Sequence, residues 1–350
     1  MAIDKKINPI NPPIEELPRI DQYAGGTVEV DVNTGQQSPV QMLQDGGAIF
    51  GQPTMPQGPM HDDNLADFID ETELEKISSD LMSDYLNDKE TRNDWEHGYT
   101  QGLDLLGFKY EDRSQPFQGA SGVTHPLLAE SVTQFQAQAY KELLPAGGPV
   151  KCNIVGSETP QVEEQARRVR EFMNYQITEV MEEYDSDMDQ MLFFLALAGS
   201  AFKKIYYDSN LDRAVAKFIP VEDLVVPYHS TDLETAPRIT HVLKQNKNDV
   251  RKSQVNGFYR DVELEVVNKQ DSIQEKYDKI DGVTPNDNQY DDQCTLLEMH
   301  CDLDIPGFED VGLNNVPTGV KLPYIVTIDE GSRKVLSIRR NYRQEDPKKK

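Results

Sequence analysis

The sequence predicts an α+β fold preceded by an irregular N-terminal tail, and three observations predict it. Between residues 64 and 198, apolar residues recur at spacings of three and four, as they do along one face of a helix. From residue 201 onward, short runs of β-branched and aromatic residues alternate with prolines and glycines, which is typical of strands. Residues 1–63 show neither pattern.

The composition narrows the classes of function. The chain has 350 residues, 37% of them hydrophobic, and a net charge of −26. Because this charge has the sign of nucleic-acid phosphates, we expect contact with DNA to be weak or restricted to local basic patches. Cys152, Cys294 and Cys301 form no CxxC motif and suit free thiols in a reducing compartment. We find no signal peptide and no apolar run of the roughly 18 residues that a membrane span needs.

Residues 1–63 are predicted to be a disordered tail. They are rich in Pro, Gly, Gln and Asn, as in GQPTMPQGPM, and cannot bury enough apolar surface to offset the entropy of the chain. Two short segments in the tail, Gly25–Val32 and Gly46–Phe50, could become ordered against a partner.

Helices are predicted over Leu65–Leu86, Trp95–Gly107 and Pro126–Leu143. The first two carry acidic opposite faces, which indicate either solvated surface or a surface that faces DNA or a basic partner. A loop over residues 113–126 precedes the third helix, in which Pro126 suits the first helical position. The PAGGP run that begins at Pro145 stops this helix, and Lys151–Val155 is predicted to be a short strand.

The stretch Val162–Tyr207 is expected to form the core, as a buried helix that leads into a strand pair. Its apolar stripe predicts two helices divided at Asp185–Asp189, with Asp185 or Ser186 capping the second. The second helix is more apolar on all sides, so we expect it to be more deeply buried and to end near Gly199. From Ala201 the residues become aromatic and β-branched, which predicts a strand.

The rest of the chain is predicted to be mainly strands. A linker is predicted at residues 281–292, and the last two strands are expected to form a hairpin around Gly331. The sequence leaves open whether it supplies a partner for its C-terminal strand. Strands are expected at Ala214–Ile219, Leu224–Val226, Arg238–Lys244, Thr295–Leu303, Tyr324–Asp329 and Val335–Arg340, and helices at Asn248–Phe258 and Asp271–Ile280.

Acidic and cysteine motifs are the candidates for metal sites in this sequence. The DSDMDQM run resembles the start of an EF-hand, but Gln190 stands at the position of the turn glycine and Ala196 at that of the bidentate glutamate. Asp302 and Asp304 imitate a DxD pair, although such pairs are common on sheet edges. A zinc site is incomplete, because it would rest on Cys294, His300 and Cys301 without a fourth ligand.

Catalytic and phosphate-binding motifs are also incomplete. The Gly-rich run at residues 118–122 is not followed by the Lys-Ser/Thr of a phosphate loop. Ser121 and His125 could supply a nucleophile and a base, but the GxSxG context is missing. We therefore expect no catalytic, cofactor-binding or metal site. A hydrolase that uses Ser121 with His125, or Asp302 with Asp304, remains the least favoured hypothesis. The histidines His61, His97, His229 and His241 are scattered and are expected to be structural.

The string RSQPFQGASGVTHPLLAESVTQFQAQAYKELLPAGGPV resembles the N-terminal region of portal proteins of tailed double-stranded DNA phages, especially short-tailed ones. The resemblance continues through FMNYQITEVMEEYDSDMDQMLFFLALAGSAFKKIYYD and FIPVEDLVVP. Further blocks are RITHVLKQNKNDVRKSQVNGFYRDVEL, EMHCDLDIPGFED and LPYIVTIDEGSRKVLSIRRNY, so the resemblance spans residues 64–345 in order.

This resemblance implies a structural, non-enzymatic protein that forms a dodecameric ring at one capsid vertex of the virion, after synthesis in the host cytoplasm. Its implied partners are the terminase large subunit, the major capsid and scaffolding proteins, tail adaptors, and double-stranded DNA that passes through the channel with weak contact. No membrane is implied. By analogy, residues 64–245 correspond to the wing and residues 246–350 to parts of the stem and clip. Because family members are commonly longer, we expect the chain to correspond to their N-terminal portion.

The charge gains a role in this interpretation, since an acidic channel wall leaves phosphates hydrated and lets DNA slide. Copies of the same acidic chain repel each other, so a ring requires apolar and paired contacts in a head-to-tail interface. Arg333, Arg339, Arg340 and Arg343 either pair with an acidic neighbour or adaptor, or are ordinary edge-strand charges. The alternative function is another capsid or tail assembly protein, such as an adaptor, that does not line the channel.

Overall fold

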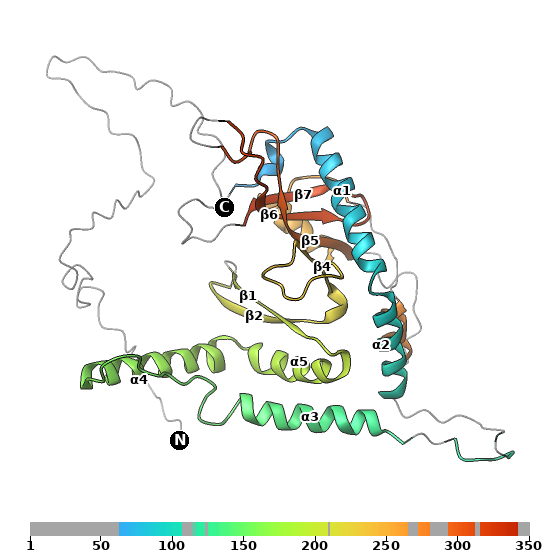
Figure 1. Cartoon of the computed structure of the whole chain (residues 1–350), viewed down its shortest axis with the longest axis vertical. Coiled ribbons are helices and arrows are strands. Elements are labelled where there is room, and N and C mark those ends of the chain that lie inside the picture. Colours follow the sequence, from blue (N-terminus) through green and yellow to red (C-terminus); the bar gives the residue numbers. More distant parts are fainter. Residues whose placement is uncertain are drawn as a thin grey trace, which may run out of the picture. The chain divides into compact units, whose positions relative to one another are not determined.

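The computed structural model describes residues 63–106, 115, 117–122, 125–208, 211–264, 272–280, 293–311 and 316–341. Helices and strands are mixed along the chain, which confirms the predicted α+β class (Figure 1). Nearly all of the predicted tail, residues 1–62, lies outside the described residues, as do Arg343 and the predicted linker at residues 281–292.

A five-stranded antiparallel sheet organises the fold, and its strands pair in chain order. Its strands are β3 (Leu224–Val225), β4 (Arg238–Asn246), β5 (Gln293–Leu303), β6 (Leu322–Asp329) and β7 (Val335–Arg340). Because β4 pairs with β5 along its whole length, the sheet crosses the division that we placed between residues 245 and 246. The partner of the last strand lies within the chain, since β6 and β7 form the predicted hairpin.

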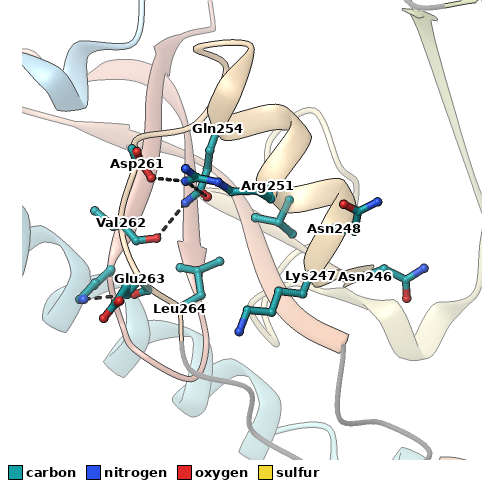
Figure 2. Close-up of a pocket in the computed structure, with 11 residues that line it drawn as sticks. Asn246, Lys247, Asn248, Arg251, Gln254, Asp261, Val262, Glu263 and Leu264 are labelled. Carbon is teal, nitrogen blue, oxygen red and sulfur yellow. Dashed lines mark hydrogen bonds and ion pairs between the residues drawn. The ribbon is translucent and has the colours of Figure 1, made fainter.

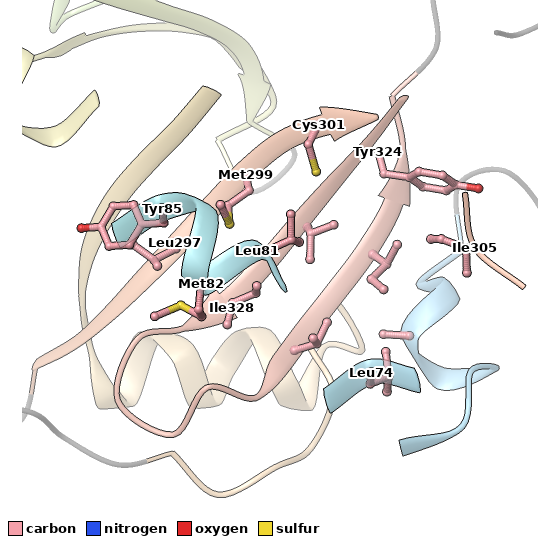
Figure 3. Close-up of a cluster of buried hydrophobic side chains, with 14 of the residues drawn as sticks. Leu74, Leu81, Met82, Tyr85, Leu297, Met299, Cys301, Ile305, Tyr324 and Ile328 are labelled. Carbon is pink, nitrogen blue, oxygen red and sulfur yellow. The ribbon is translucent and has the colours of Figure 1, made fainter. Parts of the chain in front are cut away.

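Helix α1 (Glu71–Glu90) covers one face of this sheet and completes the largest core (Figures 1 and 3). Leu81 and Tyr85 of α1 pack in one cluster with Leu297, Met299 and Ile328 of the sheet. We expected the core at Val162–Tyr207, which is wrong. The reason is that strands distant in sequence assemble into a broad apolar sheet, and this sheet buries more than any single helix can.

The opposite face of the sheet is covered in part by α6 (Lys247–Val255). Val250 and Tyr259 pack here with Cys294, Leu296 and Leu336, which alternate with the residues of the first core along their strands.

The outer edge of β7 is closed by the side chain of Asn64, just before the short 3-10 turn η3 (Leu65–Asp67). Asn64 is 6% exposed, and its Nδ2 donates to the Leu336 carbonyl at 3.1 Å. Its Oδ1 accepts a hydrogen bond from the Ile338 amide at 3.0 Å. One carboxamide thus pairs with the edge strand as a further strand would, which leaves these buried backbone groups satisfied.

The remaining helices and a second sheet form the other part of the fold. The antiparallel ribbon of β1 (Phe202–Asp208) and β2 (Arg213–Ile219) confirms the strand pair expected after the helical stretch. Helix α5 (Tyr184–Ala198) ends at Gly199, as predicted, because this glycine has φ 84° and its amide bonds to the Leu195 carbonyl. The bounds are α2 (Asn93–Leu106), α3 (Leu127–Leu143), α4 (Pro160–Tyr175), the π-helical turn η4 (Gln176–Val180), α5 (Tyr184–Ala198), β1 (Phe202–Asp208), β2 (Arg213–Ile219), the 3-10 turn η5 (Val221–Asp223) and α7 (Ser272–Ile280).

Three local predictions are wrong. The helical stretch is interrupted at residues 181–183, before Asp185, so neither Asp185 nor Ser186 is a cap and both lie in the first turn of α5. Lys151–Val155 forms no strand, and the preceding Val150 is bonded to the Asn174 side chain. Pro126 is the N-cap of α3, one position before the helix begins.

We predict that Asn64→Ala lowers the free energy of unfolding by about 2 kcal/mol, because it leaves the buried Ile338 amide of β7 without a partner. The Leu336 carbonyl keeps its hydrogen bond from the Arg260 amide at 2.9 Å. Urea unfolding measures the change. The exposed Asn93→Ala serves as the control and is expected to have little effect. Equal stability of Asn64→Ala and the unchanged protein would contradict this account of the sheet edge.

Candidate assembly surface

Alternating carboxylates at the start of α5 attach this helix to its neighbours. Glu183 and Asp187, one turn apart, accept hydrogen bonds from the β2 amides of Ala216 (3.1 Å) and Phe218 (2.7 Å). These carboxylates therefore satisfy amide groups that β1 does not pair.

The next face of the same helix holds α3. Asp185 accepts a hydrogen bond from the Tyr140 hydroxyl at 2.5 Å, and Asp189 accepts one from the Gln136 amide at 2.7 Å. The acidic run that resembles an EF-hand is thus used for joining α5 to α3 and β2. Its spacing, with carboxylates at every second residue of a helix, distributes them over two faces.

Helices α3 and α4 and strand β1 leave many apolar side chains exposed, and we call this set the assembly surface. Phe172 is 59% exposed, and α4 as a whole contains no buried residue. We expected α5 to be deeply buried, yet only Met188 and Leu192 are buried within it. The assembly surface consists of Leu127, Phe135, Leu143, Val169, Phe172, Met173, Tyr175, Ile205 and Tyr207.

A single asparagine anchors α4 to the segment before it. The Asn174 side chain accepts a hydrogen bond from the Val150 amide at 2.9 Å and donates to the Val150 carbonyl at 3.3 Å. Gly148 permits this approach, because a Cβ there would lie 2.5 Å from Asn174 Cγ, and because its φ of +92° is strained for any other residue.

We predict that Gly148→Ala weakens this anchor by about 1 to 2 kcal/mol. Trypsin digestion provides the measurement, since Arg167, Arg168 and Arg170 of α4 are exposed cleavage sites. Cleavage in α4 should become faster in Gly148→Ala. The matched control is Gly147→Ala, where a Cβ meets nothing within 4 Å; an equal acceleration in this control would refute the role of Gly148.

A cluster of charged and titratable groups links the ribbon to the large sheet, and we call it the polar joint: Lys204, His241, Glu298 and His300. Lys204 Nζ of β1 forms an ion pair with Glu298 Oε1 of β5, and His300 Nε2 lies 3.1 Å from the same oxygen. His241 of β4 stands opposite Glu298 in the strand register. Polar groups thus connect the ribbon to the large sheet.

Burial and neighbouring charges shift the pKa values of two groups in the polar joint, Glu298 and His241. Burial raises the pKa of Glu298, but the hydrogen bond with His300 and the Lys204 ammonium outweigh it and lower this pKa to about 2. Burial, followed by the nearby Lys204 ammonium, lowers the pKa of His241 to about 4. Lys217 and His300 act in the same direction on His241, and Glu298 opposes them.

We predict that the fold loses stability in acid because of His241. The unfolded chain binds a proton near pH 6.5 and the folded chain only near pH 4, so stability falls as the pH drops through this window. Between pH 7 and pH 4, the melting temperature of His241→Leu should fall less than that of the unchanged protein. His97→Leu, at an exposed position of α2, is the control. An identical pH profile for His241→Leu and the unchanged protein would contradict the prediction.

A groove with a volume of about 1150 Å³ lies beside α6 (Figure 2). Its walls are held by contacts within the chain. Gln254 donates to the Val262 carbonyl at 2.8 Å, Arg251 pairs with Asp261, and Lys334 donates to the Glu263 carbonyl at 3.1 Å. These bonds position the segment over residues 261–264, and we assign no ligand to the groove.

The residues tested as metal sites are dispersed in the structure. Cys294 and Cys301 are buried in different cores on opposite faces of β5 and cannot bind the same metal ion. Asp302 and Asp304 are exposed at the end of β5. Within the described ranges, no group of three or more His, Cys, Asp or Glu side chains could hold a metal ion.

The remaining candidate residues also lie apart from any cavity described above. Ser121 and His125 are exposed before α3. Arg339 Cζ lies 4.5 Å from the centre of the Phe258 ring, and Arg340 Cζ lies 5.1 Å from the centre of the Tyr324 ring. Both arginines therefore contact aromatic rings of their own chain. In the part of the chain that the structure describes, no helix has the length and apolar character that a membrane crossing requires.

No protein-family model and no curated protein matches the chain. The resemblance to portal proteins therefore stays a prediction from the quoted strings.

Proposed function

We propose that this chain is a structural subunit of the portal ring of a tailed double-stranded DNA phage, the conduit for packaging and ejection of DNA. The observation that carries the proposal is the assembly surface. A chain with a net charge of −26 exposes Phe135 on α3, Phe172 on α4 and Ile205 on β1, and such side chains call for a protein partner.

The charge supports the same function. A ring of acidic subunits repels itself, so its contacts must come from apolar and paired groups, and the assembly surface offers the apolar part. An acidic wall also releases DNA readily, because it neutralises few phosphates. In this proposal residues 64–245 belong to the wing, and residues 246–350 approach the stem and clip. The terminase large subunit, capsid and scaffolding proteins and tail adaptors are the partners, and the virion is the location.

Electron microscopy of the purified chain tests the proposal. We expect rings of roughly twelve subunits and only weak binding of duplex DNA at physiological salt. A chain that stays monomeric at high concentration, or that binds duplex DNA tightly, would refute it. Binding to preformed portal rings without forming rings itself would point to the adaptor alternative.

A further inference from the structure

Helix α4 carries an apolar stripe with an arginine on each side. Val162, Ala166, Val169 and Met173 recur every three or four residues, and Phe172 lies beside them. At 3.6 residues per turn, Arg168 and Arg170 fall on the two borders of this stripe. Arg167 points to the opposite side of the helix, where it pairs with Glu171 at 3.8 Å.

Among the described residues, the stripe remains largely exposed and its bordering arginines form no ion pair. Val169 is 53% exposed and Phe172 is 59% exposed. Arg168 and Arg170 form no ion pair within the described ranges. Apart from the hydrogen bonds of Asn174, α4 packs extensively only on η4, which continues the same helix, within the described residues. Because an isolated helix of this length is marginal in water, α4 requires a further surface to pack on.

The chemistry of α4 selects the kind of partner. Cations beside an apolar stripe fit a surface that is both apolar and acidic. Around the polar part of α4 lie Glu163, Glu164 and Glu171, whereas helices that lie on anionic membranes have basic polar faces. The same glutamates oppose contact with nucleic-acid phosphates. An acidic protein surface is therefore the matching partner.

The chain itself is such a partner. Its net charge is −26, and α1 presents Glu75, Glu90 and the half-exposed Leu86 to solvent on one side of the helix. We propose that the α4 stripe packs on an acidic, apolar surface of a second copy of this chain, with Arg168 and Arg170 bound to carboxylates of that copy. This inference rests on the proposed function, since it names the contact that joins neighbours in the ring. A contact between two different surfaces is head-to-tail, and it forms a ring when the rotation from one copy to the next closes on the first.

Substitutions on the two sides of α4 test the inference in the full chain. Sedimentation velocity gives the concentration at which half of the protein is assembled. We expect Arg168→Gln/Arg170→Gln and Phe172→Gln each to raise this concentration at least tenfold. Arg167→Gln removes a charge from the same helix on its other side and should leave assembly unchanged. Circular dichroism verifies that each variant keeps its helix content.

The outcomes separate the inference from the proposed function. If the unchanged chain assembles and the variants beside the stripe assemble equally well, the α4 contact is wrong while the ring proposal stands. If the unchanged chain does not assemble, the ring proposal falls and the contact falls with it. Binding of the unchanged chain to phosphatidylglycerol vesicles that Phe172→Gln abolishes would assign the stripe to a membrane surface and overturn the inference.

Discussion

The pairing of β4 with β5 is the interaction on which the rest of the fold depends. It joins Arg238–Asn246 to Gln293–Leu303, which are distant along the chain, and creates a sheet with two apolar faces. Helix α1 and helix α6 then have a surface to cover, and the ribbon has an ion-pair partner in Glu298. Without this pairing, the flanking elements would lack the surface against which they are buried.

The sequence pattern predicts the elements well where their own residues decide them. Helices α2, α3 and α7 and the β6–β7 hairpin lie close to the expected ranges, because spacing and turn residues are local signals. Helix α1 begins at Glu71 and not at the predicted Leu65, which lies in the separate 3-10 turn η3. The core could not be located in this way. Its position depends on which strands pair, and one face of β5 looks much like the other in sequence, with Leu296 and Leu297 side by side.

The candidate surface was predictable only in part. The apolar stripe of α4 is plain in the sequence, but periodicity normally indicates a buried face, and only the structure shows that Phe172 is left exposed. The aspartates at residues 185–189 are a second example. Their spacing imitates a cation loop, whereas their partners, Tyr140, Gln136 and the Phe218 amide, are identified only once the fold is known.

The side chain that closes β7 has a consequence for how copies of the chain can meet. Asn64 fills the hydrogen-bonding positions of Leu336 and Ile338, so a neighbour cannot continue the sheet there through its backbone. At this edge, a second copy can be contacted only through side chains. Side-chain contacts tolerate small rotations that a shared backbone ladder would forbid, so in the proposed ring a contact at this edge leaves adjoining molecules some freedom to tilt against one another.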